Sequence, residues 1–354
     1  MENVKVLIWG FGAMGSGMAK MLLKKQGVEI VGICDMHPER VGKNFKDILK
    51  CQDTWHPDVF INADIDALIA STEADICLLA TDSFTKNAYD KIIKLVEAKL
   101  NVVTTAEEMA YPQAGEPELA AKIDEYARKN GVSVLGTGVN PGLIMDLLVI
   151  VLTGGMEEVD HITARRVNSL SPFGPAVMAE QGVGLPEATF NELVASGKMA
   201  GHVGFKESVG MMAEALGWNM EKFEQQMSPI ITDVDRRSPY GFAAKGAVAG
   251  VNMTGQGWVD GEVKLDMQHP QQIEPQLAGQ DTGDYITIKG NPEINMTITP
   301  EVDGGIGTIA MCVNMIPHVI NAAPGLKTMI DLPVPRCIMG DMRKMIKQRK
   351  MIKQ

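Results

Sequence analysis

Three glycines near the start of the chain, Gly10, Gly12 and Gly15, have the spacing G-x-G-x-x-G. The apolar run Val4–Trp9 before them is typical of a buried parallel strand, and a segment with helical character follows. This context makes the pattern a dinucleotide-binding fingerprint, because a glycine-rich turn into a helix N-terminus exposes N–H groups to a pyrophosphate. The residues that we predict to contact the cofactor phosphates are Gly10, Phe11, Gly12, Ala13, Met14 and Gly15.

A carboxylate and a guanidinium follow the second predicted strand, Val28–Cys34. Asp35 lies about twenty residues beyond the fingerprint, where a carboxylate accepts hydrogen bonds from the adenosine ribose hydroxyls. Its charge repels the 2′-phosphate of NADP, whereas nearby Arg40 is able to accommodate that phosphate. The pair favours NAD and leaves NADP open. Asp35 is also placed to cap a helix predicted over Pro38–Leu49, and the two roles are compatible.

Small polar residues follow the next two predicted strands. Ala80 ends the strand Ala74–Ala80, Thr81 and Ser83 follow it, and Thr105 ends the next strand. Ligands of open α/β sheets bind beyond the carboxyl ends of the strands, so these residues are predicted to line the nicotinamide half of the cofactor site. Simple capping of the helix that begins near Phe84 is an equally good interpretation of the first three.

Two adjacent carboxylates, Glu107 and Glu108, also follow a strand. A carboxylate at the carboxyl end of a strand is a candidate general acid or base. Because adjacent side chains point in different directions, we expect only one of the two to face the cofactor. The other is expected to be solvated or to cap a helix, and the residue types alone do not choose between them.

Further polar candidates lie in the second half of the chain. Asn140 precedes Pro141, which is able to start a helix with Asn140 as its cap and so offer free N–H groups to a substrate carboxylate. Asn168 ends a predicted strand after Arg165-Arg166, where a guanidinium either grips a carboxylate or forms a surface ion pair. His269 is expected in a loop.

Composition excludes several functions. The net charge of −11 argues against binding to nucleic acid or to anionic membranes, which require a basic surface. The five cysteines are scattered, without a C-x-x-C pair or a zinc-ligand spacing, so no metal site is predicted and a reducing cytoplasm is favoured. The most apolar segment is about ten residues, too short to span a bilayer, and no signal peptide is expected before the first strand.

Strand and helix patterns alternate through about residue 150 and then change. The first part predicts an α/β, Rossmann-type, doubly wound parallel sheet over residues 1–150. Residues 151–302 predict an α+β domain for substrate binding and dimerisation, with Gly255-Gln256-Gly257 marking a turn between two of its strands. Residues 303–354 predict a helical segment that returns to the first domain. The basic repeat Lys344–Gln348 and Lys350–Gln354 at the end favours a solvated helix, with contact to an acidic partner as the alternative.

The chain resembles the 2,4-diaminopentanoate dehydrogenases, which are related to the native amine dehydrogenases, over essentially its whole length. More distantly it is similar to dihydrodipicolinate reductase and homoserine dehydrogenase. The most specific segments are Thr104–Glu108, Leu135–Gly142 and Arg165–Asn168. Homoserine dehydrogenases carry a lysine at the position of Glu107, and dihydrodipicolinate reductases carry paired histidines, which this chain lacks. Both of those activities are therefore disfavoured.

The resemblance implies a function and a set of residues. Glu107 matches the catalytic glutamate of the family, and Asn140, Asn168 and His269 match its substrate pocket. The implied reaction is NAD(P)-dependent oxidative deamination of 2,4-diaminopentanoate to 2-amino-4-oxopentanoate and ammonia, within ornithine degradation, with reductive amination in reverse. The partners are thus a small amine or ketone and ammonia.

Alternatives and assembly complete the expectations. A different amino-acid dehydrogenase or imine reductase is the second enzymatic hypothesis, and a nucleotide-sensing scaffold is the non-enzymatic one. We also expect a homodimer, because alternating residues of the second domain offer a sheet face to a second copy and symmetric dimers are the commonest assembly.

Overall fold

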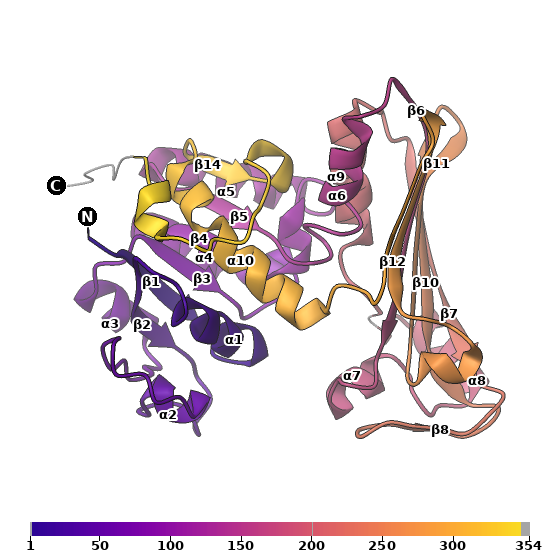
Figure 1. The fold of residues 1–354 in the computed structure, drawn as a ribbon, viewed down its shortest axis with the longest axis horizontal. Coiled ribbons are helices and arrows are strands. Elements are labelled where there is room, and N and C mark those ends of the chain that lie inside the picture. The colour runs from indigo at the N-terminus through magenta and orange to yellow at the C-terminus, as the bar shows by residue number, and fades with distance from the viewer. Residues whose placement is uncertain (1, 200, 348–354) are drawn as a thin grey trace. The chain divides into compact units, whose positions relative to one another are not determined.

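The computed structural model describes residues 2–199 and 201–347, and it divides into two compact units. The first unit comprises Met1–Leu143 and the chain from Gly304 onward, and the second comprises Ile144–Asp303 (Figure 1). Each unit is built around one six-stranded sheet. None of the described helices is long and apolar enough to cross a membrane.

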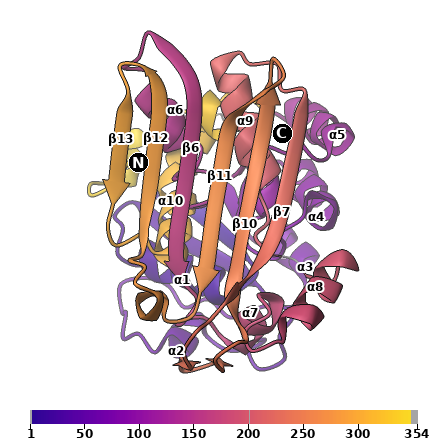
Figure 2. The ribbon, with the colours of Figure 1, turned by 90° about the vertical axis from the view of Figure 1, so that its right-hand side faces the viewer.

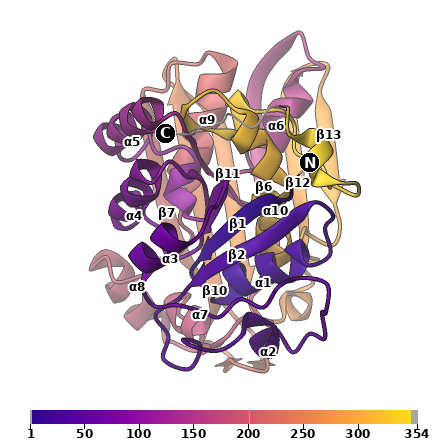
Figure 3. The same ribbon diagram turned by 90° about the vertical axis from the view of Figure 1, so that its left-hand side faces the viewer.

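The first unit contains an entirely parallel sheet, with the strand order β14-β5-β4-β3-β1-β2. Helices α4 and α5 cover one face and α1 and α10 the other (Figure 3). This is the predicted Rossmann-type doubly wound arrangement, and that prediction is confirmed. The strands are β1 (Val4–Trp9), β2 (Val28–Cys34), β3 (Ile76–Leu79), β4 (Asn101–Thr104), β5 (Ser133–Gly136) and β14 (Gly325–Lys327). The helices are α1 (Ala13–Leu22), α2 (Phe45–Leu49), α3 (Ile65–Ser71), α4 (Thr85–Glu97), α5 (Pro117–Asn130) and α10 (Gly304–Asn321), with the 3-10 turns η1 (Glu107–Ala110), η3 (Met329–Asp331) and η4 (Met342–Met345).

The core of the first unit shows why these segments fold as they do. In α4, the side chains of Ala88, Ile92, Leu95 and Val96 recur at helical spacing and are fully buried against the sheet. Burial of each large aliphatic side chain contributes roughly 1.5–3 kcal/mol. Helix α5 ends at Gly131, whose φ of 72° provides the left-handed C-terminal cap. These helices hold the carboxyl ends of β3 and β4 in place.

The second unit contains a mixed sheet in the order β13-β12-β6-β11-β10-β7 (Figure 2). Only β6 and β11 pair in parallel within it. Strands and helices are segregated, as the α+β expectation states. Its elements are α6 (Leu147–Thr153), β6 (Glu158–Ser169), α7 (Pro175–Glu180), α8 (Glu187–Ala195), α9 (Phe205–Leu216), β7 (Lys222–Ile231), β8 (Arg236–Arg237), β9 (Phe242–Ala243), β10 (Val248–Val259), β11 (Glu262–Gln272), η2 (Pro275–Ala278), β12 (Gly283–Asn291) and β13 (Ile294–Ile298).

The two faces of this second sheet differ. Helix α9 packs on the inner face, against β10 and β11. The opposite face, which we call the outer sheet face, carries no helix of this unit (Figure 2). It is lined by alternating polar side chains. The outer sheet face comprises His161, Thr163 and Arg165 of β6, Asn252, Thr254 and Gln256 of β10, Asp266 and Gln268 of β11, and Tyr285, Thr287 and Lys289 of β12.

Two local predictions are wrong. The helix expected over Pro38–Leu49 begins only at Phe45. Gly42 takes a φ of 78°, which a right-handed helix does not allow, and Asn44 is the N-cap residue of the shorter helix. The turn expected at Gly255-Gln256-Gly257 lies inside β10 instead. A Cβ on Gly255 would come within 2.8 Å of the Phe205 ring, and one on Gly257 within 2.7 Å of Val209. These glycines make room for α9 on the sheet and do not break the strand.

The C-terminal repeat is only partly visible. Residues Lys344 to Lys347 follow or belong to η4, a 3-10 turn, where a solvated helix was expected. The second copy, Lys350–Gln354, lies outside the described residues.

Candidate active site

The glycine turn has the geometry that a dinucleotide requires. Gly10 has a φ of 94°, and a Cβ there would lie 2.5 Å from the carbonyl oxygen of Ala80. A Cβ on Gly15 would lie 1.8 Å from the carbonyl oxygen of Gly10. By contrast, a Cβ on Gly12 would meet no atom within 4 Å, and Gly12 caps α1 without a side-chain hydrogen bond. Open space beside uncapped helix N–H groups therefore fits a pyrophosphate.

The sheet topology places this turn at a ligand-binding position. Strand β1 lies between β2 and β3, so the chain order reverses between β1 and β3. The ends of these two strands are linked by the hydrogen bond from the Ala80 N–H to the Trp9 carbonyl, at 2.8 Å. Crevices at such a reversal bind ligands in open α/β sheets. Of the predicted cofactor residues, the turn and Ala80 are therefore brought together.

Asp35 is held firmly against the same turn. Its Oδ2 accepts the N–H of Phe11 at 2.6 Å and a guanidinium N–H of Arg40 at 3.1 Å, while Oδ1 accepts the N–H of His37 at 2.7 Å. Burial acts to raise the pKa of Asp35, but the hydrogen bonds from His37, Phe11 and Arg40 outweigh it and lower that pKa. Asp35 therefore stays ionised beside Gly10, where a ribose hydroxyl is expected, and Arg40 partly neutralises it.

Thr81, Ser83 and Thr105 also lie at the ends of strands. The Thr81 hydroxyl bonds to Asp82, and Lys91 contacts both residues. The Thr105 N–H donates to the Leu79 carbonyl at 3.1 Å. The alternative of simple capping for Ala80–Ser83 is wrong, because the N-cap of α4 is Phe84, which provides no side-chain hydrogen bond.

The adjacent carboxylates Glu107 and Glu108 take different environments in η1. Glu108 Oε2 accepts the N–H of Thr85 at 2.7 Å and so caps α4 from outside the helix. The N–H of Glu108 also donates to the Ser83 carbonyl at 3.1 Å. These bonds attach η1 to the start of α4. Glu108 is thus committed to a structural hydrogen bond, whereas Glu107 is not part of the cap.

Glu107 is half-buried directly after β4. Burial raises the pKa of its carboxyl group, and the charge of Glu108 adds to this, while its own backbone N–H and the Ser83 hydroxyl oppose it. Gly136 permits the close approach of η1 to β5, since a Cβ there would lie 2.2 Å from the backbone of Met109. A carboxyl group with a raised pKa, at the carboxyl end of a strand, is suited to proton transfer near neutral pH.

Asn140 lies in a tight turn and not at a helix start. The expected helix from Pro141 is wrong, since α6 begins at Leu147 with Asp146 as its cap. Gly142 takes a φ of 126°, and a Cβ there would lie 2.6 Å from the backbone of Gly138. A left-handed residue at this position cannot continue a right-handed helix. Asn140 is buried, with 8% of its surface exposed.

The second unit brings Asn168 and His269 together. His269 lies within β11, not in a loop as expected, and its Nε2 is 3.0 Å from Asn168 Oδ1. Its ring stacks on Phe205 and meets His202 edge-on, with centroids 6.2 and 4.8 Å away. The Nδ1 atom of His269 is buried and has no hydrogen-bond partner among the described residues. Burial lowers the pKa of His269 well below its usual value, and His202 and Arg166 add to this, so the ring is neutral.

Arg166 adjoins this group and forms a buried ion pair. Its Nη1 lies 2.6 Å from Asp284 Oδ1, and its other terminal nitrogen bonds to the Val302 carbonyl. Asp284 Oδ2 in turn accepts the N–H of Val302 at 2.9 Å. Burial raises the pKa of Asp284, against the opposing effect of Arg166. Arg165, by contrast, lies over the Tyr285 ring on the outer sheet face.

Sequence reasoning missed two of these residues. Asp284 and His202 are far from Arg166 and Asn168 in the chain, so no spacing signal connects them. Ser83 was assigned to the cofactor, whereas its side chain also bonds to Glu107. Within the described ranges, no three His, Cys, Asp or Glu side chains gather as a metal site.

The raised pKa of Glu107 has a consequence for stability. Its folded form keeps the proton to a higher pH than the unfolded chain, so its contribution to stability falls as the pH rises from the unfolded pKa through the folded one. We predict that Glu107→Gln is more stable than the wild type at about pH 8 and equally stable at about pH 4. Urea unfolding at both pH values measures this. A stability difference that is the same at both values, or as large in the exposed control Glu262→Gln, contradicts it.

Comparison with known proteins identifies the family of this chain. Residues 143–348 match the family model described as the 2,4-diaminopentanoate dehydrogenase C-terminal domain, and residues 4–137 match the oxidoreductase family with an NAD-binding Rossmann fold. A 2,4-diaminopentanoate dehydrogenase of Acetoanaerobium sticklandii is 61% identical over 349 residues, which cover 98% of each chain.

More distant relatives are amine dehydrogenases. One from Streptomyces virginiae is 24% identical and covers 94% of this chain and 96% of its own. The solved structure of one from Mycobacterium smegmatis has a TM-score of 0.83 at 28% identity, covering 95% of this chain and 97% of its own. The predicted resemblance and the NAD or NADP cofactor are confirmed. The chain is an oxidoreductase that belongs to the 2,4-diaminopentanoate dehydrogenase family.

Proposed function

We propose that this protein oxidatively deaminates 2,4-diaminopentanoate at its 4-amino group, with NAD as the preferred cofactor and Glu107 as the general base. The products are 2-amino-4-oxopentanoate and ammonia, and the reaction runs in reverse as reductive amination. The observation that carries the proposal is the difference between two adjacent carboxylates. Glu108 caps α4, whereas Glu107 is half-buried and has a raised pKa. The relative that is 61% identical carries the name of this activity.

The proton transfers follow from this carboxylate. Ionised Glu107 takes a proton from the substrate ammonium, which frees the nitrogen lone pair. Glu107 then releases this proton to solvent. A bound nicotinamide would supply the hydride acceptor, and the substrate would become an iminium ion. Glu107, again ionised, accepts a proton from the water that attacks the iminium carbon and returns it to the departing nitrogen. Overall, the substrate ammonium, water and oxidised cofactor give ketone, ammonium, reduced cofactor and one proton.

The cluster in the second unit is proposed to hold the α-amino acid end of the substrate, together with Asn140. With Asn168 Oδ1 facing Nε2, the neutral His269 ring carries its proton on Nε2, and its Nδ1 presents a lone pair. An N–H of the α-ammonium group is the complementary donor. The amide N–H groups of Asn168 and the remaining N–H groups of Arg166 suit the carboxylate.

NAD is proposed as the preferred cofactor because Asp35 is buried, ionised and bonded to the glycine turn. The turn residues, with Ala80, Thr81, Ser83 and Thr105, are proposed to contact it. Arg40 can bind a 2′-phosphate only if its ion pair with Asp35 is broken.

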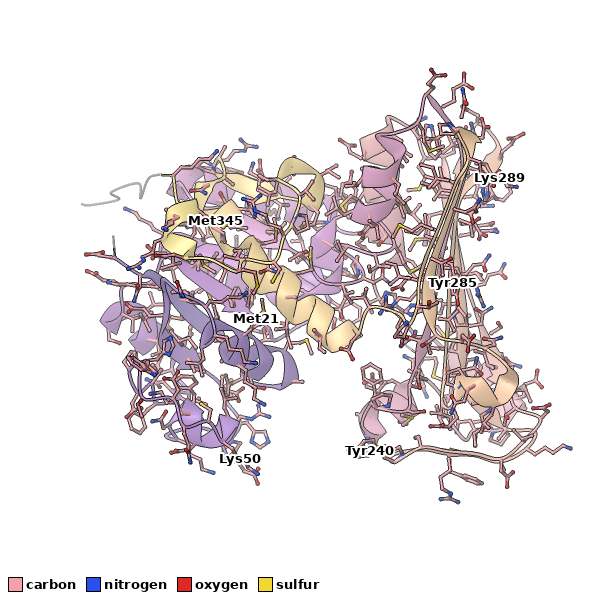
Figure 4. The ribbon with its side chains drawn as sticks, in the orientation of Figure 1. Met21, Lys50, Tyr240, Tyr285, Lys289 and Met345 are labelled. Atoms are coloured by element: carbon pink, nitrogen blue, oxygen red, sulfur yellow. The ribbon has the colours of Figure 1, made fainter. Side chains whose placement is uncertain are left out.

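Assembly and setting are further proposals. We propose a homodimer through the outer sheet face, on which Tyr285 and Lys289, four residues apart, lie on the same side of β12 (Figure 4). Light scattering that gives 38.3 kDa in place of twice this mass contradicts the dimer. The five cysteines are all free, which supports a reducing cytoplasm. The reaction is placed in ornithine degradation, and its loss should abolish growth that depends on ornithine.

The first of three kinetic predictions concerns the two glutamates. Glu107→Gln cannot accept a proton, so kcat for ammonia-dependent oxidation of reduced cofactor should fall by about 10²- to 10⁴-fold. Glu108→Gln is the matched control: it should keep turnover within about threefold and lose roughly 1 kcal/mol of unfolding free energy, because the cap of α4 is weakened. Turnover retained in Glu107→Gln and lost in Glu108→Gln reverses the assignment. Oxidation that does not require ammonium indicates an imine reductase instead.

The second prediction concerns cofactor choice. Asp35→Asn removes the charge that repels a 2′-phosphate and leaves Arg40 without its ionic partner, so the ratio of kcat/KM for NADP over NAD should rise at least about tenfold. Steady-state kinetics with both cofactors measure the ratio. Glu39→Gln removes an exposed charge from the same loop and should leave it unchanged. An unaltered ratio in Asp35→Asn refutes the role of this carboxylate.

The third prediction concerns the α-amino acid end. Asn168→Ala should lower kcat/KM for 2,4-diaminopentanoate by about 10- to 100-fold, because a charge-assisted contact and the orientation of His269 are lost. Turnover of pentan-2-amine, which lacks the α-amino acid end, should change by less than about threefold. Asn252→Ala, on the outer sheet face, is the control. An equal loss with both substrates argues against a specific contact at this end.

A further inference from the structure

The C-terminal part of the first unit encloses a pocket that the proposed reaction does not use. Its volume is about 610 Å³, which lies within the range of small-molecule sites. Its walls come from the last turn of α10, from the chain through β14 and η3, and from η4 with the residues after it. Met345, labelled in Figure 4, is one of the lining residues. None of the predicted cofactor or substrate residues lines this pocket.

The lining is strongly cationic in a chain that is acidic overall. Lys327, Arg336, Lys344 and Lys347 line the pocket, and none of the four forms an ion pair within residues 2–199 and 201–347. One lining carboxylate, Asp331, is turned toward its own 3-10 helix, where it accepts the N–H and the hydroxyl of Thr328 at 2.8 and 2.9 Å. Positive charge is therefore in clear excess.

A buried imidazole adds a second, independent observation. His318, in the last turn of α10, lines the pocket with only 7% of its surface exposed. Its Nε2 is buried and has no hydrogen-bond partner among the described residues. Burial lowers the pKa of His318, and the nearby charges of Arg336 and Lys347 lower it further. A buried polar atom without a partner is costly unless a ligand or water satisfies it.

The pocket is also fixed in shape. Asn321, at the end of α10, donates its amide N–H to the Met345 carbonyl at 2.7 Å and accepts the N–H of Lys347 at 2.9 Å. These two bonds tie the segment after η4 to the helix end. Cations near a helix C-terminus also compensate the helix dipole, but that dipole amounts to about half a charge, and four cations exceed what it requires. A site with preorganised charges loses little entropy when it binds an anion.

We propose that this pocket binds a small phosphorylated molecule. Its phosphate groups contact Arg336, Lys344 and Lys347, and a phosphate oxygen shares a proton with His318 Nε2. A diphosphate concentrates several negative charges in a volume that the pocket accommodates, and arginine and lysine are the side chains that recognise phosphate. A polynucleotide is disfavoured by the net charge of −11. The site is separate from the dinucleotide turn, so it provides a second place where a phosphorylated metabolite acts on the enzyme.

The test measures binding of inorganic pyrophosphate by calorimetry, with the full chain saturated by NADH so that the glycine turn is occupied. The pocket variant is Arg336→Gln with Lys347→Gln. The control is Arg237→Gln with Lys245→Gln, which removes one exposed arginine and one exposed lysine from the second unit. We expect the wild type and the control to bind equally, within about twofold, and the pocket variant to bind at least about tenfold more weakly. Arg336→Lys with Lys347→Arg should restore binding.

A second readout follows His318 itself. Pyrophosphate should raise the pKa of the His318 ring in the wild type, as seen by imidazole NMR with His318→Gln for assignment, and should not do so in the pocket variant. Unchanged thermal unfolding and unchanged ammonia-dependent turnover without pyrophosphate show that the variants fold. Any of four results would overturn the proposal. The first two are no binding by the wild type and equal binding by the pocket variant and the control. The others are no change at His318 and tighter binding of citrate than of pyrophosphate. These readouts are independent of the activity proposed for Glu107.

Discussion

The hydrogen bond from the Thr85 N–H to Glu108 is the contact on which the proposed chemistry depends. Two adjacent glutamates at the end of a strand are chemically equivalent until the fold separates them. The start of α4 engages Glu108, and this attaches η1 to the unit and leaves Glu107 half-buried beside Ser83. Glu108 accepts a hydrogen bond from the start of α4, whereas burial raises the pKa of the Glu107 carboxyl group and suits it to proton exchange. One short segment thus provides both a structural and a chemical group.

In the second unit, polar groups are buried on the inner face of the sheet. Arg166 and Asp284 compensate each other, and the backbone of Val302 forms a hydrogen bond with each of them. Removing either partner would leave a buried charge uncompensated. The charge of Arg166 also helps to keep the nearby His269 ring neutral. The neutral His269 ring, stacked on Phe205, then offers one nitrogen to Asn168 and one to a ligand. Recognition of a polar substrate is therefore built on a cluster that is itself held by an ion pair.

Charge is distributed unevenly in the first unit. Asp35 is surrounded by N–H groups and Arg40, so a negative charge is stabilised at the cofactor turn. Around His318, the cations of the C-terminal segment lack such partners in the described part of the chain, and the buried Nε2 of His318 has no hydrogen-bond partner there. A protein that binds an anionic cofactor at one place has the means to sense a second anion at another. The Asp35 charge is thus compensated by groups of the protein itself, whereas the cations around His318 are available to a bound anion.

Much of the fold was determined by local sequence signals. The strand Val4–Trp9, the glycine spacing, the apolar face of α4 and the limits of α10 depend on neighbouring residues, so the sequence alone predicts them. The tertiary structure decided the rest, because those features depend on groups far apart in the chain. Gly255 and Gly257 resemble turn residues until α9 packs on them, and Gly142 prevents the helix that Pro141 suggests. Arg166 meets a carboxylate 118 residues away, and Thr85 selects Glu108 over its neighbour. Local spacing encodes which elements form, but only packing brings their side chains together and sets which charges are buried, paired or free to react.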